Sequence, residues 1–100
     1  MPSASHNPLP LVRIVATWNG EEYAIVDLTG TCAGSKIRDQ ILYKLQVPLE
    51  SRADYFIYLS EIGSLAIGTP LNDEQLYYVC AERGDPSGSL KFFVSKSAYM

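Results

Sequence analysis

Apolar and polar residues alternate in two neighbouring segments near the start of the chain, residues 11–18 and 23–28. Successive side chains of a β-strand point to opposite faces, so this alternation predicts two strands with one apolar face each. A three-residue loop at residues 19–21 would join them as a hairpin and place Arg13 opposite Asp27 on the outer face. A loop of two or four residues would bury the unpaired Asp27 carboxylate, which costs several kcal/mol. The three-residue loop is therefore predicted, with Trp18 on the core face.

A helical pattern follows the hairpin over residues 35–46. Ser35 is its predicted N-cap, and Pro48 follows its end, because the residue before a proline avoids the helical region. Apolar side chains at helical spacing form one stripe on this segment: Ile37, Ile41, Leu42 and Leu45.

A second helix is predicted over residues 73–83. Asn72 stands at its N-cap, and Gln75 completes a capping-box pair with it. Gly84 follows as a stop signal.

Three more segments have the composition and alternation of strands, at residues 54–60, 65–67 and 90–95. The resulting order is ββαββαβ. It predicts an α+β fold, the ubiquitin-like β-grasp, in which one main helix packs on a mixed five-stranded sheet. The other face of the sheet is expected to be largely open to solvent.

The composition changes at both ends of the chain. Residues 1–9 are small, polar and proline-bearing, which predicts a disordered leader, and residues 97–100 read as the start of a linker. The folded domain is expected over residues 10–96. The whole chain of 100 residues has the size of one ordinary domain.

The net charge of −3 and a pI of about 4.9 argue against partners that need a basic surface. Nucleic-acid binders and proteins of anionic membranes carry clustered lysines and arginines. No apolar run approaches the roughly 20 residues of a membrane span, and no secretion signal is visible. A cytoplasmic domain without direct membrane insertion is therefore predicted.

The two cysteines, Cys32 and Cys80, stand far apart in sequence. Free thiols in a reducing compartment are one interpretation, and a disulfide between the two is the other. Cys80 shares the apolar side of the second helix with Leu76 and Val79, which favours a buried structural thiol. Cys32 has no activating base nearby in sequence.

The sequence offers no catalytic constellation. His6, the only histidine, falls in the predicted leader, and the chain contains no CxxC, HExxH, GxSxG or GxxxxGK[ST] motif. The aromatic residues fall at strand spacing without interleaved basic residues, which is typical of sheet packing. A non-catalytic domain without cofactor or metal is predicted.

Two segments carry a resemblance to a known family. LNDEQLYYVC, followed by a polar loop and LKFFV, resembles the Ras-binding domain of fungal MAP kinase kinase kinases of the mating and filamentation pathways. The opening LVRIVATWNG is similar to that family's first strand and turn. The resemblance covers about residues 10–96, and it implies that the parent chain is a serine/threonine protein kinase.

This resemblance implies a binding site as well as a fold. In Ras effectors of this fold, the second strand pairs with an edge strand of the GTP-loaded GTPase, and basic side chains meet its acidic switch region. The second strand here departs from the pattern, because it has no lysine or arginine and follows Glu21 and Glu22. Carried over by position, the expected partner-binding residues are Arg13, Tyr23, Ile25, Lys36, Arg38 and Lys44.

Two alternatives stay open at this point. The same fold could bind a signalling scaffold or adaptor protein in place of Ras. A third hypothesis is an enzyme or a ubiquitin-type modifier. A conjugated modifier normally ends in Gly-Gly, whereas this chain ends in SAYM.

Overall fold

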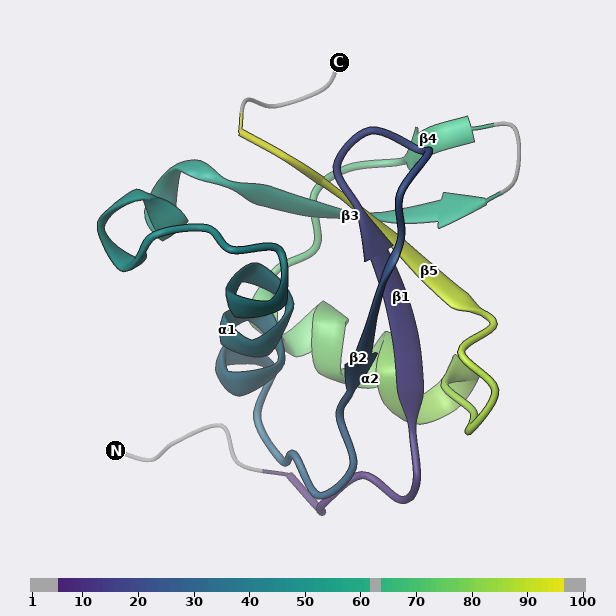
Figure 1. Ribbon diagram of the computed structural model, residues 1–100. Coiled ribbons are helices and arrows are strands. Elements are labelled where there is room, and N and C mark those ends of the chain that lie inside the picture. The colour runs from purple at the N-terminus through teal and green to yellow at the C-terminus, as the bar shows by residue number, and fades with distance from the viewer. Residues whose placement is uncertain (1–5, 62–63, 97–100) are drawn as a thin grey trace.

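The computed structural model of the chain describes residues 6–61 and 64–96 (Figure 1). Its elements follow the predicted order, with one short 3-10 helix that the sequence pattern did not predict. In chain order they are β1 (Arg13–Thr17), β2 (Ala24–Asp27), α1 (Gly34–Lys44), the 3-10 helix (Leu49–Asp54), β3 (Phe56–Glu61), β4 (Ser64–Ile67), α2 (Asp73–Arg83) and β5 (Leu90–Ser95).

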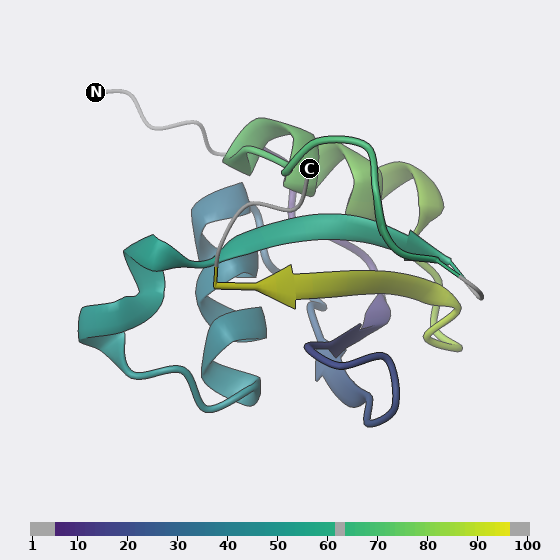
Figure 2. The same cartoon turned by 90° about the horizontal axis from the view of Figure 1, so that it is seen from above.

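The strands form one mixed sheet in the order β2-β1-β5-β3-β4. β1 pairs antiparallel with β2 and parallel with β5, and β3 pairs antiparallel with both β5 and β4. α1 stands to one side of the strands, while α2 runs along the β3 side of the molecule (Figure 2). This arrangement confirms the predicted α+β, ubiquitin-like β-grasp.

The register between β1 and β2 is the one predicted from the position of Asp27. Arg13 pairs with Asp27, and Ile14 pairs with Val26. The side-chain oxygen of Asn19 accepts hydrogen bonds from the two backbone amides that follow Gly20, at 2.8 and 3.0 Å, and so holds the hairpin loop. The Asp27 carboxylate consequently lies outside the core.

The core lies between α1, α2 and the inner face of the sheet. The predicted stripe of α1 is confirmed, since Ile37, Ile41 and Leu42 are buried and Leu45 packs against the core at its border. The other buried apolar residues of this cluster come from every layer: Leu9, Val12, Ile14, Ala16, Val26, Leu28, Val47, Ile57, Leu76, Tyr77, Cys80, Leu90, Phe92 and Val94.

The predicted boundaries of α1 are wrong at both ends. The N-cap is Ala33, not Ser35, and no side chain caps the helix. At the other end, Gln46 adopts a left-handed conformation with φ 64°, and the next residue, Val47, donates a 2.9 Å hydrogen bond to the carbonyl of Leu42. This closing pattern ends the helix at Lys44, before the proline can.

Both predicted boundaries of α2 are confirmed. The Asn72 side chain accepts a 2.8 Å bond from the Gln75 amide, and the Gln75 side chain accepts a 2.9 Å bond from the Asn72 amide. The helix ends at Gly84, and glycine is needed there for a steric reason, because a Cβ would lie 2.4 Å from the Cys80 carbonyl oxygen. Its φ of −71° needs no glycine.

The outer face of the sheet is more covered than the sequence pattern predicts. Tyr58 and Phe93 point away from the core cluster by strand alternation, yet both are buried, with ring centroids 6.3 Å apart. The hairpin loop reaches toward β4, since a Cβ at Gly20 would lie 2.5 Å from Leu65 Cδ2. The prediction of a largely open face is therefore wrong at the centre of the sheet.

The described residues 6–9 contact the folded domain. The His6 ring stacks on Tyr77 at 4.2 Å, and its backbone amide donates a 2.6 Å bond to the Cys32 carbonyl. Leu9 is buried in the core. The rest of the predicted leader, residues 1–5, and the predicted linker at 97–100 lie outside the described residues, and the predicted boundaries remain predictions.

The two helices meet closely at their N-termini. A Cβ added to Gly34 would lie 1.8 Å from the backbone oxygen of Asp73. One turn further along α1, Arg38 contacts the same place: its Nε donates to Asp73 Oδ1 and its Nη2 to the Leu71 carbonyl, both at 2.7 Å. Glycine is therefore required at position 34 by the space that α2 leaves.

We predict that Gly34→Ala lowers the free energy of unfolding by about 2–3 kcal/mol, because the helices must separate to admit the methyl group. Urea titration followed by circular dichroism measures this. Ser35→Ala, on the exposed side of the same turn, is the control and should change stability by less than about 0.5 kcal/mol. An alanine at position 34 that stabilises the domain, as helix propensity alone would dictate, contradicts the close approach.

Candidate functional site

The edge of β2 carries backbone groups without a partner strand. β2 is the end strand of the sheet and lies at the margin of the molecule opposite α2 (Figure 2). The Leu28 amide donates a 2.9 Å bond to the Val12 carbonyl, which makes this a hydrogen-bonded pair of the antiparallel ladder. Such pairs alternate along the ladder, so Val26 also faces β1. The N–H and C=O groups of Ile25 therefore point outward, toward solvent.

The side chains along this edge are apolar at its start and acidic at its end. Tyr23 is 44% exposed and Ile25 is 61% exposed. Hydrogen bonds from the Thr29 side chain and backbone, with a smaller contribution from Arg13, hold the pKa of Asp27 below its usual value. Asp27 is therefore a stable negative charge at neutral pH.

Arg13 stands on the outer face of β1, next to this edge. Its guanidinium donates a 3.0 Å hydrogen bond to the Pro86 carbonyl, and its backbone amide bonds to Asp85. The residue thus joins the hairpin to the loop before β5. Asp27 is its cross-strand neighbour, and this negative charge weakens the attraction of Arg13 for an acidic partner.

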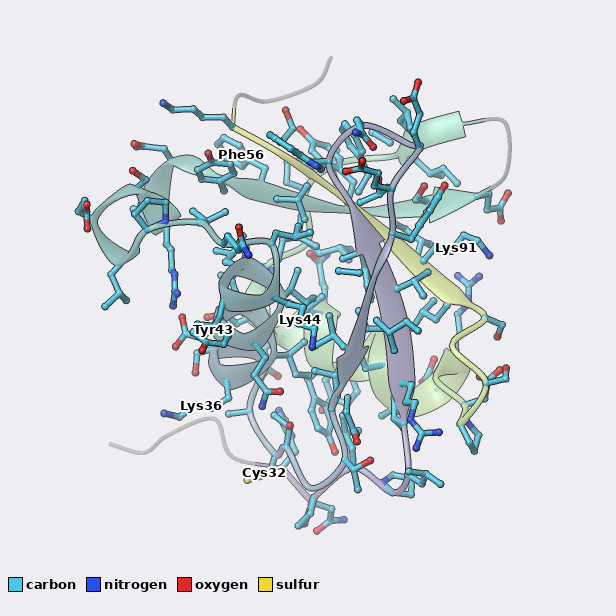
Figure 3. All side chains as sticks on the ribbon, in the orientation of Figure 1. Cys32, Lys36, Tyr43, Lys44, Phe56 and Lys91 are labelled. Atoms are coloured by element: carbon cyan, nitrogen blue, oxygen red, sulfur yellow. The ribbon has the colours of Figure 1, made fainter. Side chains whose placement is uncertain are left out.

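Lys44 and Lys36 stand near opposite ends of the β2 edge. Lys44 lines a hollow of about 300 Å³ together with Tyr23 and Ala24 at the start of the strand. Lys36 lines another, of about 280 Å³, with residues 29–32, which follow the strand. Figure 3 shows Lys44 on the β2 side of α1, whereas Lys36 projects away from it. The structure therefore places Lys44, but not Lys36, beside Tyr23.

Arg38 does not join this group. Its guanidinium is held by Asp73 and by the Leu71 carbonyl, and its side chain is only 22% exposed. The geometry gives it a part in fixing α2 on α1. Its predicted role in partner binding has no support from this position.

Sequence reasoning missed an aromatic surface beside the edge. Trp18, predicted on the core face, is 65% exposed, so that prediction is wrong. The residue stands one position beyond the end of β1, beside the end of α1, the loop that follows it and Val94 of β5. Its place next to the hairpin turn was the one signal available in the sequence. Tyr43, at 72% exposure, and Leu49, at 76%, lie further around the end of α1.

The described part of the chain contains no group of three or more histidine, cysteine or acidic side chains that could hold a metal ion. Cys32 and Cys80 are both free, which agrees with the first of the two interpretations. Burial raises the pKa of the Cys80 thiol to about 12. Neither helix in residues 6–61 and 64–96 is long and apolar enough to cross a membrane.

This fold and surface define the class of the protein. It is a β-grasp domain with an open edge strand, and Lys44 and several exposed aromatic rings flank that edge. No family model matches the chain. Two curated proteins do: the mitogen-activated protein kinase kinase kinase MCK1 of Pyricularia oryzae and the mitogen-activated protein kinase kinase kinase mkh1 of Cytospora mali. They are 34% and 36% identical to the chain over 83 residues.

The matched segment covers 83% of this chain but only 5% and 4% of the two kinases. The chain is therefore homologous to a small region of fungal MAP kinase kinase kinases. It has the fold described above and contains none of the H-R-D and D-F-G segments of a kinase catalytic unit.

We predict that an alkylating reagent labels Cys32 in the native protein long before Cys80. The reactive species is the thiolate, and burial suppresses it at Cys80. Mass spectrometry after timed labelling measures the order, and both thiols should react in denaturant. Equal native rates at the two sites would contradict the buried position of Cys80.

A pair of proline variants tests the orientation of the β2 backbone. Ile25→Pro removes an outward N–H and should cost no more than about 1 kcal/mol, because prolines are tolerated on the solvent side of edge strands. Val26→Pro removes a bond to β1 and should cost about 2–3 kcal/mol. Thermal melts compare the two variants, and the reverse order would place the free edge on the wrong residues.

Proposed function

We propose that the chain is a non-catalytic, cytoplasmic protein-interaction domain of a fungal MAP kinase kinase kinase and that it binds a GTP-loaded Ras-family GTPase. In this role the edge of β2 pairs with an edge strand of the GTPase, and Lys44 and Lys36 attract its acidic surface. The parent chain would be a serine/threonine protein kinase that the domain recruits to the GTPase. The similarity to MCK1 and mkh1 supports the kinase context.

The outward backbone groups of β2 support this function most strongly. An unpaired strand edge is a template for another chain, and β-strand addition uses such edges to bind a partner through main-chain hydrogen bonds. β2 is short, from Ala24 to Asp27, and no proline or lysine within it blocks the approach. Ile25 offers both a donor and an acceptor at its centre.

The two lysines supply the charge that the strand lacks. Neither Lys36 nor Lys44 forms an ion pair in the described part of the chain, and both are exposed. Charges at the rim of an interface mainly raise the association rate and set its salt dependence. Lys44, beside Tyr23, is the better placed of the two.

A scaffold or adaptor protein is the second candidate partner. Glu21 and Glu22 lead into the edge, and Asp27 ends it. This acidic strand and loop would repel the acidic switch region of a GTPase and would favour a neutral or basic edge strand. The docking mode would stay the same.

We expect the domain to bind a GTP-loaded Ras protein more tightly than the same protein loaded with GDP. Replacing both lysines, Lys36→Glu with Lys44→Glu, should weaken binding at least about tenfold at low salt, with a smaller loss at high salt, because the charges are exposed. Calorimetric titration at two salt concentrations measures both effects. Arg83→Glu with Lys91→Glu is the control, since it changes the net charge equally at a different hollow, which both residues line together with Ser60 and Glu61 of β3.

Three outcomes separate the candidates. Equal binding to the two nucleotide states contradicts the Ras function. A loss of affinity in the control pair equal to that in the lysine pair contradicts the site. Binding to a scaffold protein that Ile25→Pro abolishes, with no GTP-dependent Ras binding, would favour the second candidate.

A further inference from the structure

Trp18 separates two adjoining hollows beside the start of β2. One, of about 230 Å³, is lined by Pro48, Tyr55 and neighbouring apolar residues. The other, of about 300 Å³, is lined by Glu22, Tyr23 and the stem of Lys44. Leu45 and Gln46 belong to both hollows. We call this surface the Trp18 groove, and it consists of Trp18, Glu22, Tyr23, Leu45, Pro48 and Tyr55.

The ring of Trp18 is unusually exposed to solvent for so large an apolar side chain. It is 65% exposed, although it stands between Tyr23 and Tyr55. Its indole N–H donates no hydrogen bond among residues 6–61 and 64–96. A tryptophan with a solvated ring and a free donor is typical of a surface that receives a ligand carrying both an apolar side chain and a hydrogen-bond acceptor.

The free donor favours one backbone conformation for that ligand. A helix uses its carbonyls internally, and an added β-strand would pair with the outward backbone groups of Ile25, which does not line the groove. A polyproline II helix has no internal hydrogen bonds, so its carbonyls are free to accept. Proline-rich segments in this conformation bind in aromatic-lined grooves.

The charge at one end of the groove specifies the ligand further. Asn19 fixes the backbone of Glu21 and Glu22 through bonds of 2.8 and 3.0 Å, and both side chains are exposed. Neither carboxylate has an ion-pair partner in the described part of the chain. Lys44 lies on the α1 side of the same hollow, so a basic group on the ligand would belong on the loop side, next to Glu22.

We propose that the Trp18 groove binds a proline-rich segment in the polyproline II conformation, with an arginine or lysine at the end near Glu22. Two apolar or proline side chains fill the hollows on either side of Trp18, and the indole N–H donates to a ligand carbonyl. This site adjoins the start of β2 and shares Tyr23 with that edge, but it does not use the outward backbone groups of Ile25 and does not depend on a GTPase partner.

Trp18 is the only tryptophan of the chain, so its fluorescence reports on the groove directly. We expect a synthetic Arg-Pro-Leu-Pro-Pro-Leu-Pro peptide to change its emission in a saturable way, with a dissociation constant below the millimolar range. The matched peptide with every proline replaced by alanine should bind at least about tenfold more weakly, because it loses the preformed conformation. Equal binding of the two peptides, or no saturable change with either, would overturn the proposal.

Matched variants locate the site. Tyr23→Ala and Glu22→Gln should each weaken the peptide about five- to tenfold, since aromatic rings and opposite charges dominate such small interfaces. Tyr43→Ala is the control, because this tyrosine is exposed but lines neither hollow. Trp18→Ala, measured by calorimetry and checked for folding by circular dichroism, should abolish binding. A Tyr43→Ala effect as large as that of Tyr23→Ala would also overturn the assignment.

Discussion

The β1–β2 ladder determines most of what this domain can present to a partner. β1 is bonded on both sides, antiparallel to β2 and parallel to β5, whereas β2 is bonded only to β1. The alternation of the ladder then directs the backbone N–H and C=O groups of Val26 toward β1 and those of Ile25 toward solvent. A register shifted by one residue would bury the Asp27 carboxylate and turn Val26, now in the core, to solvent. The same pairing therefore sets both the stability of the core and the position of the free edge.

The junction of the two helices sets the position of α1, and with it the lysines and the groove. Gly34 lets α1 approach the backbone of Asp73, and Arg38 fixes that contact through its guanidinium. The other end of α1 closes at Gln46, whose left-handed conformation turns the chain toward Pro48. The hollow beside Trp18 forms at this turn, between the end of the helix and the hairpin. Arg38, expected at the binding surface, thus instead helps to hold the two helices that support that surface.

The sequence predicts those features that depend on neighbours along the chain. Asn72 and Gln75 form the expected capping box, and the Arg13–Asp27 register follows from the cost of burying one carboxylate. The misses depend on residues distant in sequence. Trp18 is exposed although alternation places it on the core face, and Tyr58 is buried on a face that alternation alone leaves open.

In the candidate site, too, the features that depend on neighbours along the chain are easier to predict than those that depend on distant residues. Tyr23 and Lys44 line one hollow, because a hairpin and the following helix fix their places. Arg38 is engaged by Asp73, 35 residues later in the chain, and no local pattern reveals such a partner. The short 3-10 helix from Leu49 to Asp54, close to the Trp18 groove, likewise carries no clear periodicity.

Amide hydrogen exchange at Ile25, with and without a GTP-loaded Ras protein, tests the central claim most directly. The outward Ile25 N–H has no partner among residues 6–61 and 64–96, so it should exchange rapidly in the free domain. We expect strong protection of this amide in the complex with the GTP form, with little change at Val26, which is already bonded to β1. Binding of the GTP form that leaves Ile25 unprotected would contradict strand addition at this edge.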